Sequence, residues 1–478
     1  MVDSSSELRI EESAGDDSHV AWLPDLLYTN GRFERGLALV CDRQGRITKV
    51  ARADEVVASS IFPLRNRALL PGLVNAHSHA FQRVIRGRTE YRTGARDSFW
   101  TWREMMYSAA SRLGPEDIYD ASRMAFLEMA LCGITSVGEF HYLHRTPEGS
   151  PYDDPNLLAK EVVRAALDVG LRIALLRVAY ARSGFRTEPN ERQSRFIEAD
   201  AQIYLRNVDA LQSNLARMDG AWVGVAPHSV RAVPLPYLKE VFGFAHERGL
   251  ALHMHLAEQP AEIEACMDEH GRTPVALLES EGLLHDRFTG IHVIHITPEE
   301  ARALSHARAI VCACPTTERN LGDGIVPTEL FFGEGVRVSL GTDSHAQVDL
   351  LEDARELEMH LRLRQLERAV LARESDGLTS IAARLLDCAT IHGADSLGME
   401  GGKLLPGSPA DFFTVDLDDP SIAGAGLDDL LPCIVFALGR AGVREVFVGA
   451  QPVIKEGRHR AAPEIVQKFA ALQRRLWS

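Results

Sequence analysis

The amino-acid sequence predicts an α/β protein, a (β/α)8 barrel of the TIM type with a small β-sandwich domain built from both ends of the chain. Three observations support this fold class. Eight short apolar runs alternate with longer amphipathic stretches through the middle of the chain, β-like segments flank that middle, and most of the apolar runs end in polar side chains. Buried parallel strands are continuous apolar runs, and repeated strand–helix units close into such a barrel. An open doubly wound sheet is the alternative fold, but no Gly-x-Gly-x-x-Gly motif follows the first run.

The small domain is expected from residues 21–68 together with residues 401–460. Gly45 separates two apolar segments, a pattern typical of a β-hairpin. The candidate strands are residues 37–41, 46–50, 411–415, 443–448 and 453–457. Residues 1–20 are acidic and rich in serine, so we expect them to be disordered or loosely attached.

Residues 69–400 form the expected catalytic barrel. Its candidate strands are the apolar runs at residues 69–77, 133–140, 172–180, 222–228, 251–255, 290–295, 309–314 and 336–343. Most of the stretches between them have helical character. Residues 115–131 begin with a proline that suits a first turn, and residues 157–169 end at Gly170. Residues 461–478 predict a C-terminal packing helix, because their apolar side chains recur at helical spacing.

The composition argues against a nucleic-acid-binding protein and against a membrane protein. The 478 residues carry a net charge of −15, which argues against non-specific binding to nucleic acid. No apolar run reaches membrane-spanning length and the N-terminal stretch has no apolar signal region, so no membrane association is expected. The seven cysteines are odd in number and form no Cys-x-x-Cys pair. They predict buried thiols in a reducing compartment, and we expect a cytoplasmic protein.

A metal site is predicted where the first apolar run ends in His77 and His79. Side chains at i and i+2 of a strand point to the same face, so both imidazoles can reach one ion. His255 and Asp343, at the ends of later runs, supply a third imidazole and a carboxylate that serves as a fourth ligand or as a base. A mononuclear zinc hydrolase needs about three protein ligands and an open position for water. We predict one divalent metal ion, zinc in the first place, with iron(II) open because the same ligands suit it.

Two further residues are candidates for proton transfer. Glu258 follows His255 by three positions, so it can sit beside the metal without binding it, as a proton shuttle would. His253 shares a strand face with His255 one layer deeper, and we expect a hydrogen-bonded histidine of the barrel core there. His292 and His295 both belong to the sixth run, and their spacing does not decide which one faces the site.

Several of these stretches resemble the amidohydrolase superfamily, and the resemblance covers nearly the whole chain. They are Pro-Gly-Leu-Val-Asn-Ala-His-Ser-His at residues 71–79, His-Leu-Ala-Glu at 255–258, the strand with His292, and Gly-Thr-Asp-Ser at 341–344. The resemblance implies catalytic roles for Glu258, His292 and Asp343. Binuclear members carry a lysine or glutamate on a middle strand, and the third and fourth runs here contain no lysine, which implies one metal. A homodimer would be usual for this superfamily.

Other stretches resemble the branch of that superfamily that hydrolyses N-formimino-L-glutamate to N-formyl-L-glutamate and ammonia in histidine degradation. They are residues 80–88, 97–107, 139–144 and 226–233. The resemblance implies a small dicarboxylate substrate. It also implies five substrate-binding residues, which are Gln82, Arg103, Tyr142, His228 and Arg231.

The chemistry of that substrate agrees with these residues. Formiminoglutamate carries two carboxylates and an amidine-like carbon, and arginine binds carboxylate bidentately. Arg231 follows a strand end directly, whereas the case for Arg103 rests mostly on the resemblance. The expected mechanism is attack of a metal-activated hydroxide on the formimino carbon, with Glu258 protonating the leaving nitrogen. The division of protons among Glu258, His292 and Asp343 stays open, since coupled groups titrate together.

Two other functions are compatible with the same predicted fold. An aminohydrolase of a purine or related heterocycle would use the same mononuclear barrel, and it predicts an aromatic or amide-lined pocket in place of converging arginines. A catalytically silent binding protein of the same fold predicts missing metal ligands. The chain keeps every ligand position required, which argues against the second alternative.

Overall fold

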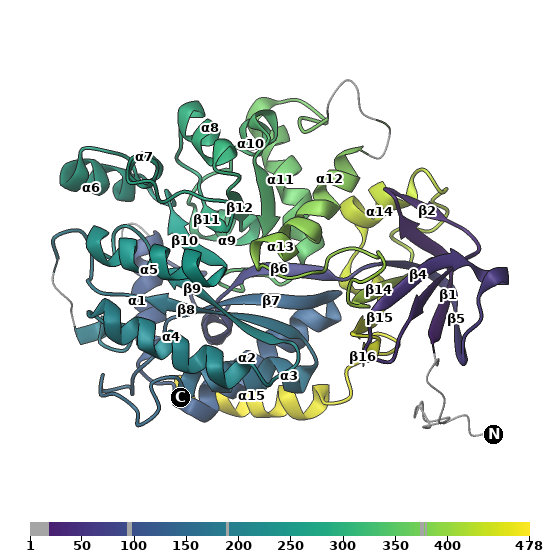
Figure 1. The fold of residues 1–478 in the computed structure, drawn as a ribbon, viewed down its shortest axis with the longest axis horizontal. Coiled ribbons are helices and arrows are strands. Elements are labelled where there is room, and N and C mark those ends of the chain that lie inside the picture. The colour runs from purple at the N-terminus through teal and green to yellow at the C-terminus, as the bar shows by residue number, and fades with distance from the viewer. Residues whose placement is uncertain (1–18, 93–97, 188–190, 373–376, 378–379) are drawn as a thin grey trace.

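The chain folds into a parallel barrel with a separate mixed sheet beside it (Figure 1). The computed structural model describes residues 19–92, 98–187, 191–372, 377 and 380–478. The expectation for residues 1–20 falls outside these ranges except at its last two positions. Both parts of the predicted fold class are confirmed, since the barrel comes from the middle of the chain and the second sheet from its two ends.

The barrel consists of eight parallel strands that pair in sequence order. They are β6 (Leu73–Ser78), β7 (Ile134–His141), β8 (Arg172–Ala179), β9 (Ala221–Pro227), β10 (Leu252–Leu256), β11 (Phe288–His292), β12 (Ile310–Ala313) and β13 (Arg337–Leu340). A parallel bridge between Ser78 and Asp343 joins the last strand to the first. The carboxyl ends of all eight strands therefore meet at one rim of a nearly closed barrel, where catalytic residues of this architecture collect.

Helices surround the barrel (Figure 1). They are α1 (Phe99–Ala110), α2 (Pro115–Leu131), α3 (Leu157–Val169), α4 (Ala201–Leu215), α5 (Leu235–Arg248), α6 (Pro260–His270), α7 (Pro274–Ser280), α8 (Pro298–His306), α9 (Pro315–Leu321), α10 (Thr328–Glu334), α11 (Leu350–Gln365), α12 (Ser380–Cys388), α13 (Ile391–Ser396), α14 (Leu430–Ala437) and α15 (Ala462–Trp477). Four short 3-10 helices are η1 (Ala53–Glu55), η2 (Ala80–Ile85), η3 (Glu191–Gln193) and η4 (Arg440–Gly442). Gly170 ends α3 with a left-handed φ of 97°, a conformation that glycine adopts without steric cost.

The small domain is one mixed sheet shared by the two ends of the chain. Its strands are β1 (Val20–Thr29), β2 (Arg32–Glu34), β3 (Leu37–Cys41), β4 (Ile47–Arg52), β5 (Ser60–Pro71), β14 (Phe412–Asp416), β15 (Val443–Val448) and β16 (Gln451–Ile454). β5 lies between β1 and β14 and pairs with both. In its core Phe412 and Phe447 stack, and Trp22 packs edge-on against both rings, which holds the N-terminal and C-terminal strands together.

The first apolar run of the sequence belongs to two sheets. Its first residues, up to Pro71, finish β5 of the small domain, and β6 of the barrel starts at Leu73. Gly72 connects the two strands. A larger residue would not fit there, because a Cβ atom would lie 2.3 Å from the Oγ1 of Thr135. The chain thus leaves the small sheet and enters the strand of the two metal-site histidines within one residue.

Two further features concern membrane-spanning helices and the cysteines. Within the described ranges, no helix is both long enough and apolar enough to span a membrane. All seven cysteines are free thiols, and six of them are buried.

Candidate active site

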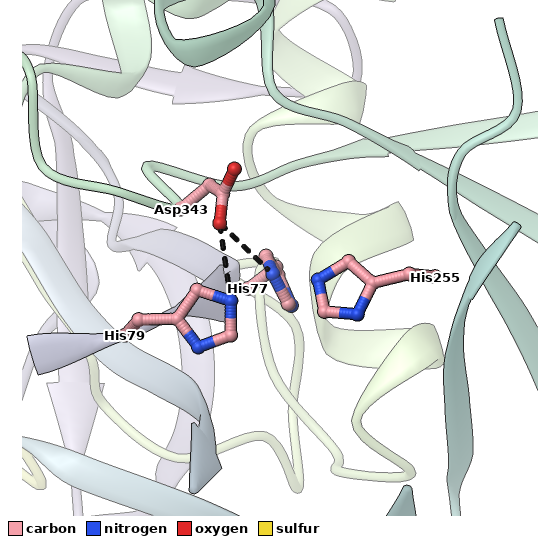
Figure 2. A group of neighbouring side chains, drawn as sticks. All are labelled: His77, His79, His255 and Asp343. Atoms are coloured by element: carbon pink, nitrogen blue, oxygen red, sulfur yellow. Dashed lines mark ion pairs between the residues drawn. The ribbon is translucent and has the colours of Figure 1, made fainter. Parts of the chain in front are cut away.

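Four predicted metal ligands converge at the carboxyl rim of the barrel. Figure 2 shows the imidazoles of His77, His79 and His255 and the carboxylate of Asp343 around one point. One donor atom of each residue lies within 4.8 Å of the others, and all four side chains are buried. The Oδ1 atom of Asp343 lies 3.3 Å from Nε2 of His77 and 3.2 Å from Nε2 of His79.

The backbone of β6 and the segment after β13 hold these residues in register. The amide of Asp343 donates to the carbonyl of His77 at 3.1 Å, and the amide of His79 donates to the carbonyl of Asp343 at 3.0 Å. A Cβ atom on Gly341 would come within 2.6 Å of the His77 Cβ, so only glycine permits this approach of the two strands. The geometry of the site is therefore set by the point at which the barrel closes.

The hydrogen bonds of the histidines direct lone pairs toward the centre. Nδ1 of His79 donates to the carbonyl of Phe140 at 2.9 Å, and Nδ1 of His255 donates to the carbonyl of His228 at 3.1 Å. Neither ring nitrogen of His77 has a hydrogen-bond partner among the described residues. Burial lowers the pKa of His77 to about 3 and holds that of His255 well below its ordinary value, so these imidazoles are neutral.

Buried acceptors that face one another fit a cation. The Nδ1 atom of His79 faces the carbonyl of Phe140, so its Nε2 atom faces the carboxylate of Asp343, at 3.2 Å. Two acceptors at this distance in a buried site repel each other unless a positive charge lies between them. Three imidazoles and one carboxylate are a donor set that suits a divalent transition metal such as zinc. The residues present thus fit the metal that the sequence predicts.

Glu258 and His292 lie beside this group. The Nε2 atom of His292 is 3.7 Å from Oε1 of Glu258 and 3.8 Å from Oδ2 of Asp343. Burial and the nearby charge of Asp343 raise the pKa of Glu258. Burial alone would lower the pKa of His292, but the charge of Glu258 and a hydrogen bond to Glu318 outweigh it and raise that pKa well above its ordinary value. Both groups are therefore suited to carry protons.

The other two histidines considered from the sequence lie elsewhere. His295 donates from Nε2 to the carbonyl of Asp323 at 3.0 Å, so the structure brings His292 and not His295 to the site. His253 is fully buried and donates to the carbonyl of Ser396 at 2.7 Å, as expected of a core histidine.

Strained backbone gathers at the same rim. Five residues with side chains adopt a positive φ there, which are Ala257, His292, Val293, Asp343 and His345. Residues other than glycine rarely adopt this conformation, and it persists where the surrounding structure enforces it. The strain coincides with the segments that carry the candidate catalytic residues.

A cavity opens beside the metal group, and all five predicted substrate-binding residues line it. Gln82, Tyr142 and His228 line its wall next to the histidines, and Nε2 of Gln82 donates to the Tyr142 hydroxyl at 2.8 Å. Arg103 comes from α1, and Arg231 follows β9. The structure thus brings together residues that are far apart in the sequence.

The two arginines of the cavity have no carboxylate partner. In the described part of the chain, neither Arg103 nor Arg231 forms an ion pair, and the Nε of each is buried without a hydrogen-bond acceptor. The indole of Trp100 lies against both guanidinium groups, with ring-centroid distances of 4.5 Å to Arg103 and 5.8 Å to Arg231. Two partly buried cations without an ion-pair partner make a site for an anionic ligand.

Two residues of the site were missed in the sequence. Glu318, in the first turns of α9, lies 3.1 Å from Nδ1 of His292. Gln193, in η3, donates at 2.8 Å to the hydroxyls of both Tyr107 and Tyr180, which line the cavity. Neither residue ends a strand, so the rule that led to the other candidates could not find them. The only signal for Glu318 was its place just after the seventh apolar run.

Comparisons with known proteins agree with this geometry. The amidohydrolase family model matches residues 68–453. Over 410 residues the chain is 38% identical to formimidoylglutamate deiminase of Pseudomonas aeruginosa, which covers 85% of this chain and 89% of that protein. The chain belongs to the amidohydrolase family. It is accordingly a hydrolase that acts on C–N bonds, and the resemblance found in the sequence is confirmed.

Solved structures of other proteins have the same fold. The crystal structure of an amidohydrolase from Brucella melitensis has a TM-score of 0.87 and 32% identity, and the match covers 97% of this chain and 100% of that one. An adenosine deaminase from Xanthomonas campestris, solved with bound zinc, has a TM-score of 0.80 and 21% identity over 96% and 98% of the two chains. The second similarity concerns the fold alone.

Proposed function

We propose that this amidohydrolase hydrolyses N-formimino-L-glutamate to N-formyl-L-glutamate and ammonia. The proposal is carried by two partly buried arginines, which form no ion pair among the described residues and line the same cavity as the three-histidine and aspartate group. A dicarboxylate supplies the missing anions. The 38% identity to formimidoylglutamate deiminase supports the same substrate.

Arg103 and Arg231 would hold the carboxylates of the substrate. The Trp100 indole packs against both guanidinium groups, which limits their movement and prepares them for a planar anion. Gln82, Tyr142 and His228 lie between the arginines and the metal group, where they can orient the chain of the substrate. The formimino carbon would then face Glu258 and His292.

We propose zinc as the bound metal, held by His77, His79, His255 and Asp343. When bound, the ion would polarise a water molecule, lower its pKa to about 7, and stabilise the negative charge that develops on its oxygen. Metal analysis of the purified protein decides between zinc and iron(II), which the same ligands accept.

The residues around the metal would move the protons. Asp343 or His292 accepts the proton of the attacking water as its oxygen bonds to the formimino carbon. Glu258, whose pKa is raised by burial and by Asp343, then gives a proton to the nitrogen that leaves. The hydroxyl on the carbon then gives up its proton and the nitrogen takes a second one. The C–N bond breaks, ammonia departs, and the carbon keeps the new oxygen as the formyl group.

The decisive experiment is ammonia release by the metal-loaded protein. The substrates are N-formimino-L-glutamate, N-formimino-L-aspartate, adenosine and 5-methylthioadenosine at equal concentration. We expect turnover of formiminoglutamate and no ammonia from the two purine nucleosides. Turnover of a nucleoside without turnover of formiminoglutamate would replace this proposal with the purine aminohydrolase.

We further propose that the enzyme is a cytoplasmic homodimer that binds neither nucleic acid nor membrane. Seven free cysteines suit a reducing compartment. Sedimentation of the purified chain tests the dimer, and a monomer at micromolar concentration would overturn it.

A further inference from the structure

We infer that Glu318 is a positioning residue for His292: its carboxylate binds Nδ1 of His292 and holds Nε2 toward the space between Glu258 and Asp343, where the water and the substrate react. The inference rests on the proposed function, because it assigns how the candidate acid–base histidine is prepared. It is carried by the hydrogen bond of 3.1 Å between Nδ1 of His292 and Oε1 of Glu318.

The two ring nitrogens of His292 have different surroundings. Nδ1 lies 3.1 Å from the carboxylate of Glu318, whereas Nε2 is buried without a hydrogen-bond partner among the described residues. Nε2 points to the space between Glu258 and Asp343, at 3.7 and 3.8 Å from their oxygens. An unpartnered buried nitrogen there fits a group that meets its partner only when water and substrate are bound.

The carboxylate of Glu318 is itself held firmly. Its Oε1 atom also accepts a hydrogen bond from the amide of Cys314 at 2.8 Å, and the amide of Glu318 donates to the carbonyl of Cys314 at 2.9 Å. The side chain is only 2% exposed. Among the described residues, no lysine or arginine forms an ion pair with it, and its one ionic contact is with His292.

A carboxylate oxygen in this position dictates the orientation of the ring. It accepts a hydrogen bond from Nδ1, and this bond turns Nε2 toward Glu258 and Asp343. This is the role that a buried aspartate plays toward the histidine of a serine protease.

The experiment compares two variants of Glu318 with a matched control. Glu318→Gln keeps an acceptor without the charge, and Glu318→Ala removes both. Asp353→Ala is the control, because Asp353 is a fully buried carboxylate that accepts from the amide of Thr316 at 3.0 Å in the same helix start. Among the described residues, it forms no hydrogen bond or ion pair with a residue of the site described above.

We expect kcat for formiminoglutamate to fall about 10- to 100-fold in Glu318→Ala and less in Glu318→Gln. KM and the bound metal should stay as in the wild type. The control should lose thermal stability and keep its kcat. A normal kcat in Glu318→Ala would overturn the inference, and so would loss of bound metal, which would make Glu318 a ligand.

A second readout needs no substrate. In the metal-loaded protein with 15N-labelled histidine, His292 should show a slowly exchanging proton on Nδ1, assigned by its absence in His292→Gln. The signal should vanish in Glu318→Ala and remain in Asp353→Ala; its persistence in Glu318→Ala would overturn the inference. A wild type that shows this signal but does not turn over formiminoglutamate would refute the proposed function and leave the positioning role intact.

Discussion

At the scale of the residue, the site is defined by acceptor atoms that face one another without a donor between them. The carboxylate of Asp343 and the Nε2 atoms of His77 and His79 are buried and close. Such a group is costly in the absence of a cation, so binding of the metal should stabilise the folded protein as well as serve the reaction.

His255→Ala tests the metal group. This change removes one of three imidazole ligands, so we expect bound metal and ammonia release to be lost together. His253→Ala is the matched control, since His253 lies on the same strand and bonds the Ser396 carbonyl away from the metal. Metal equivalents are measured by elemental analysis after dialysis. A full equivalent in His255→Ala would remove His255 from the set of ligands.

Arg231→Ala tests the carboxylate site. A hydrogen bond between charged groups contributes about 1.5–3 kcal/mol, so KM for formiminoglutamate should rise about 10- to 100-fold. Metal content should not change, because Arg231 contacts no ligand. Arg83→Ala is the control: this arginine is already paired with Glu128 at 3.0 Å, and its loss should leave KM as it was. An unaltered KM in Arg231→Ala would move the carboxylate site elsewhere.

The sequence identified residues at strand ends better than residues that support them. His77, His255 and Asp343 were predictable because strand periodicity and barrel topology bring such positions to one rim. Glu318 was not predictable, because its side chain reaches the site from a helix turn whose direction depends on the packing of α9. Gln193 acts through two tyrosine hydroxyls, and no local pattern encodes that contact.

At the scale of the element, the closure of the barrel between β6 and β13 controls the site. Gly341 permits that closure, since a Cβ there would lie 2.6 Å from the His77 Cβ and 2.8 Å from its carbonyl oxygen. Any side chain at this position must push the two strands apart and shift the ligands that they carry.

Gly341→Ala should therefore lower the free energy of unfolding by about 1–3 kcal/mol, the usual cost of overpacking, and weaken metal binding. Gly333→Ala in α10 is the control, because a Cβ there meets no atom within 4 Å. Gly333 lies in the last turn of α10, so that change should leave stability unchanged or raise it by up to about 1 kcal/mol. Thermal unfolding with and without added metal measures both effects. Equal behaviour of the two variants would show that the closure tolerates a side chain.

Element boundaries show where sequence reasoning stops. The helices α2, α3 and their caps were predictable from a proline at one end and Gly170 at the other. The division of the first apolar run between β5 and β6 was not, because both halves are equally apolar. The boundary between the two halves lies at Gly72, where the side chain of Thr135 approaches the backbone closely. Thr135 belongs to another strand, so the local sequence does not show this contact.

At the scale of the whole molecule, buried ion pairs fix the barrel against its helical layer. Arg177, on β8, is fully buried and pairs with Glu198, while its Nε donates to Asn156 at 2.8 Å. Burial raises the pKa of Glu198, but Arg177 and the hydrogen bonds outweigh this effect and lower it to about 2. The carboxylate therefore stabilises the fold above its unfolded pKa of about 4.5, and this contribution is lost as the pH falls toward 2.

We expect the wild type to lose about 2 kcal/mol more unfolding free energy than Glu198→Gln between pH 5 and pH 3. The variant lacks the titrating group, so its stability should depend less steeply on pH, although it is lower at pH 7 because Arg177 is left without its anion. Urea unfolding at several pH values gives both curves. Parallel curves would mean that Glu198 does not carry this dependence.

The position of β5 has a consequence for synthesis of the chain on the ribosome. One neighbour of this strand, β1, precedes it, and the other, β14, follows the entire barrel in the sequence (Figure 1). At roughly 5–20 residues per second, β5 waits on the order of tens of seconds for that second partner. During this time its edge is open to pairing with other nascent chains. The strand that leads into the metal-site histidines is thus among the first parts to be made and among the last to be covered.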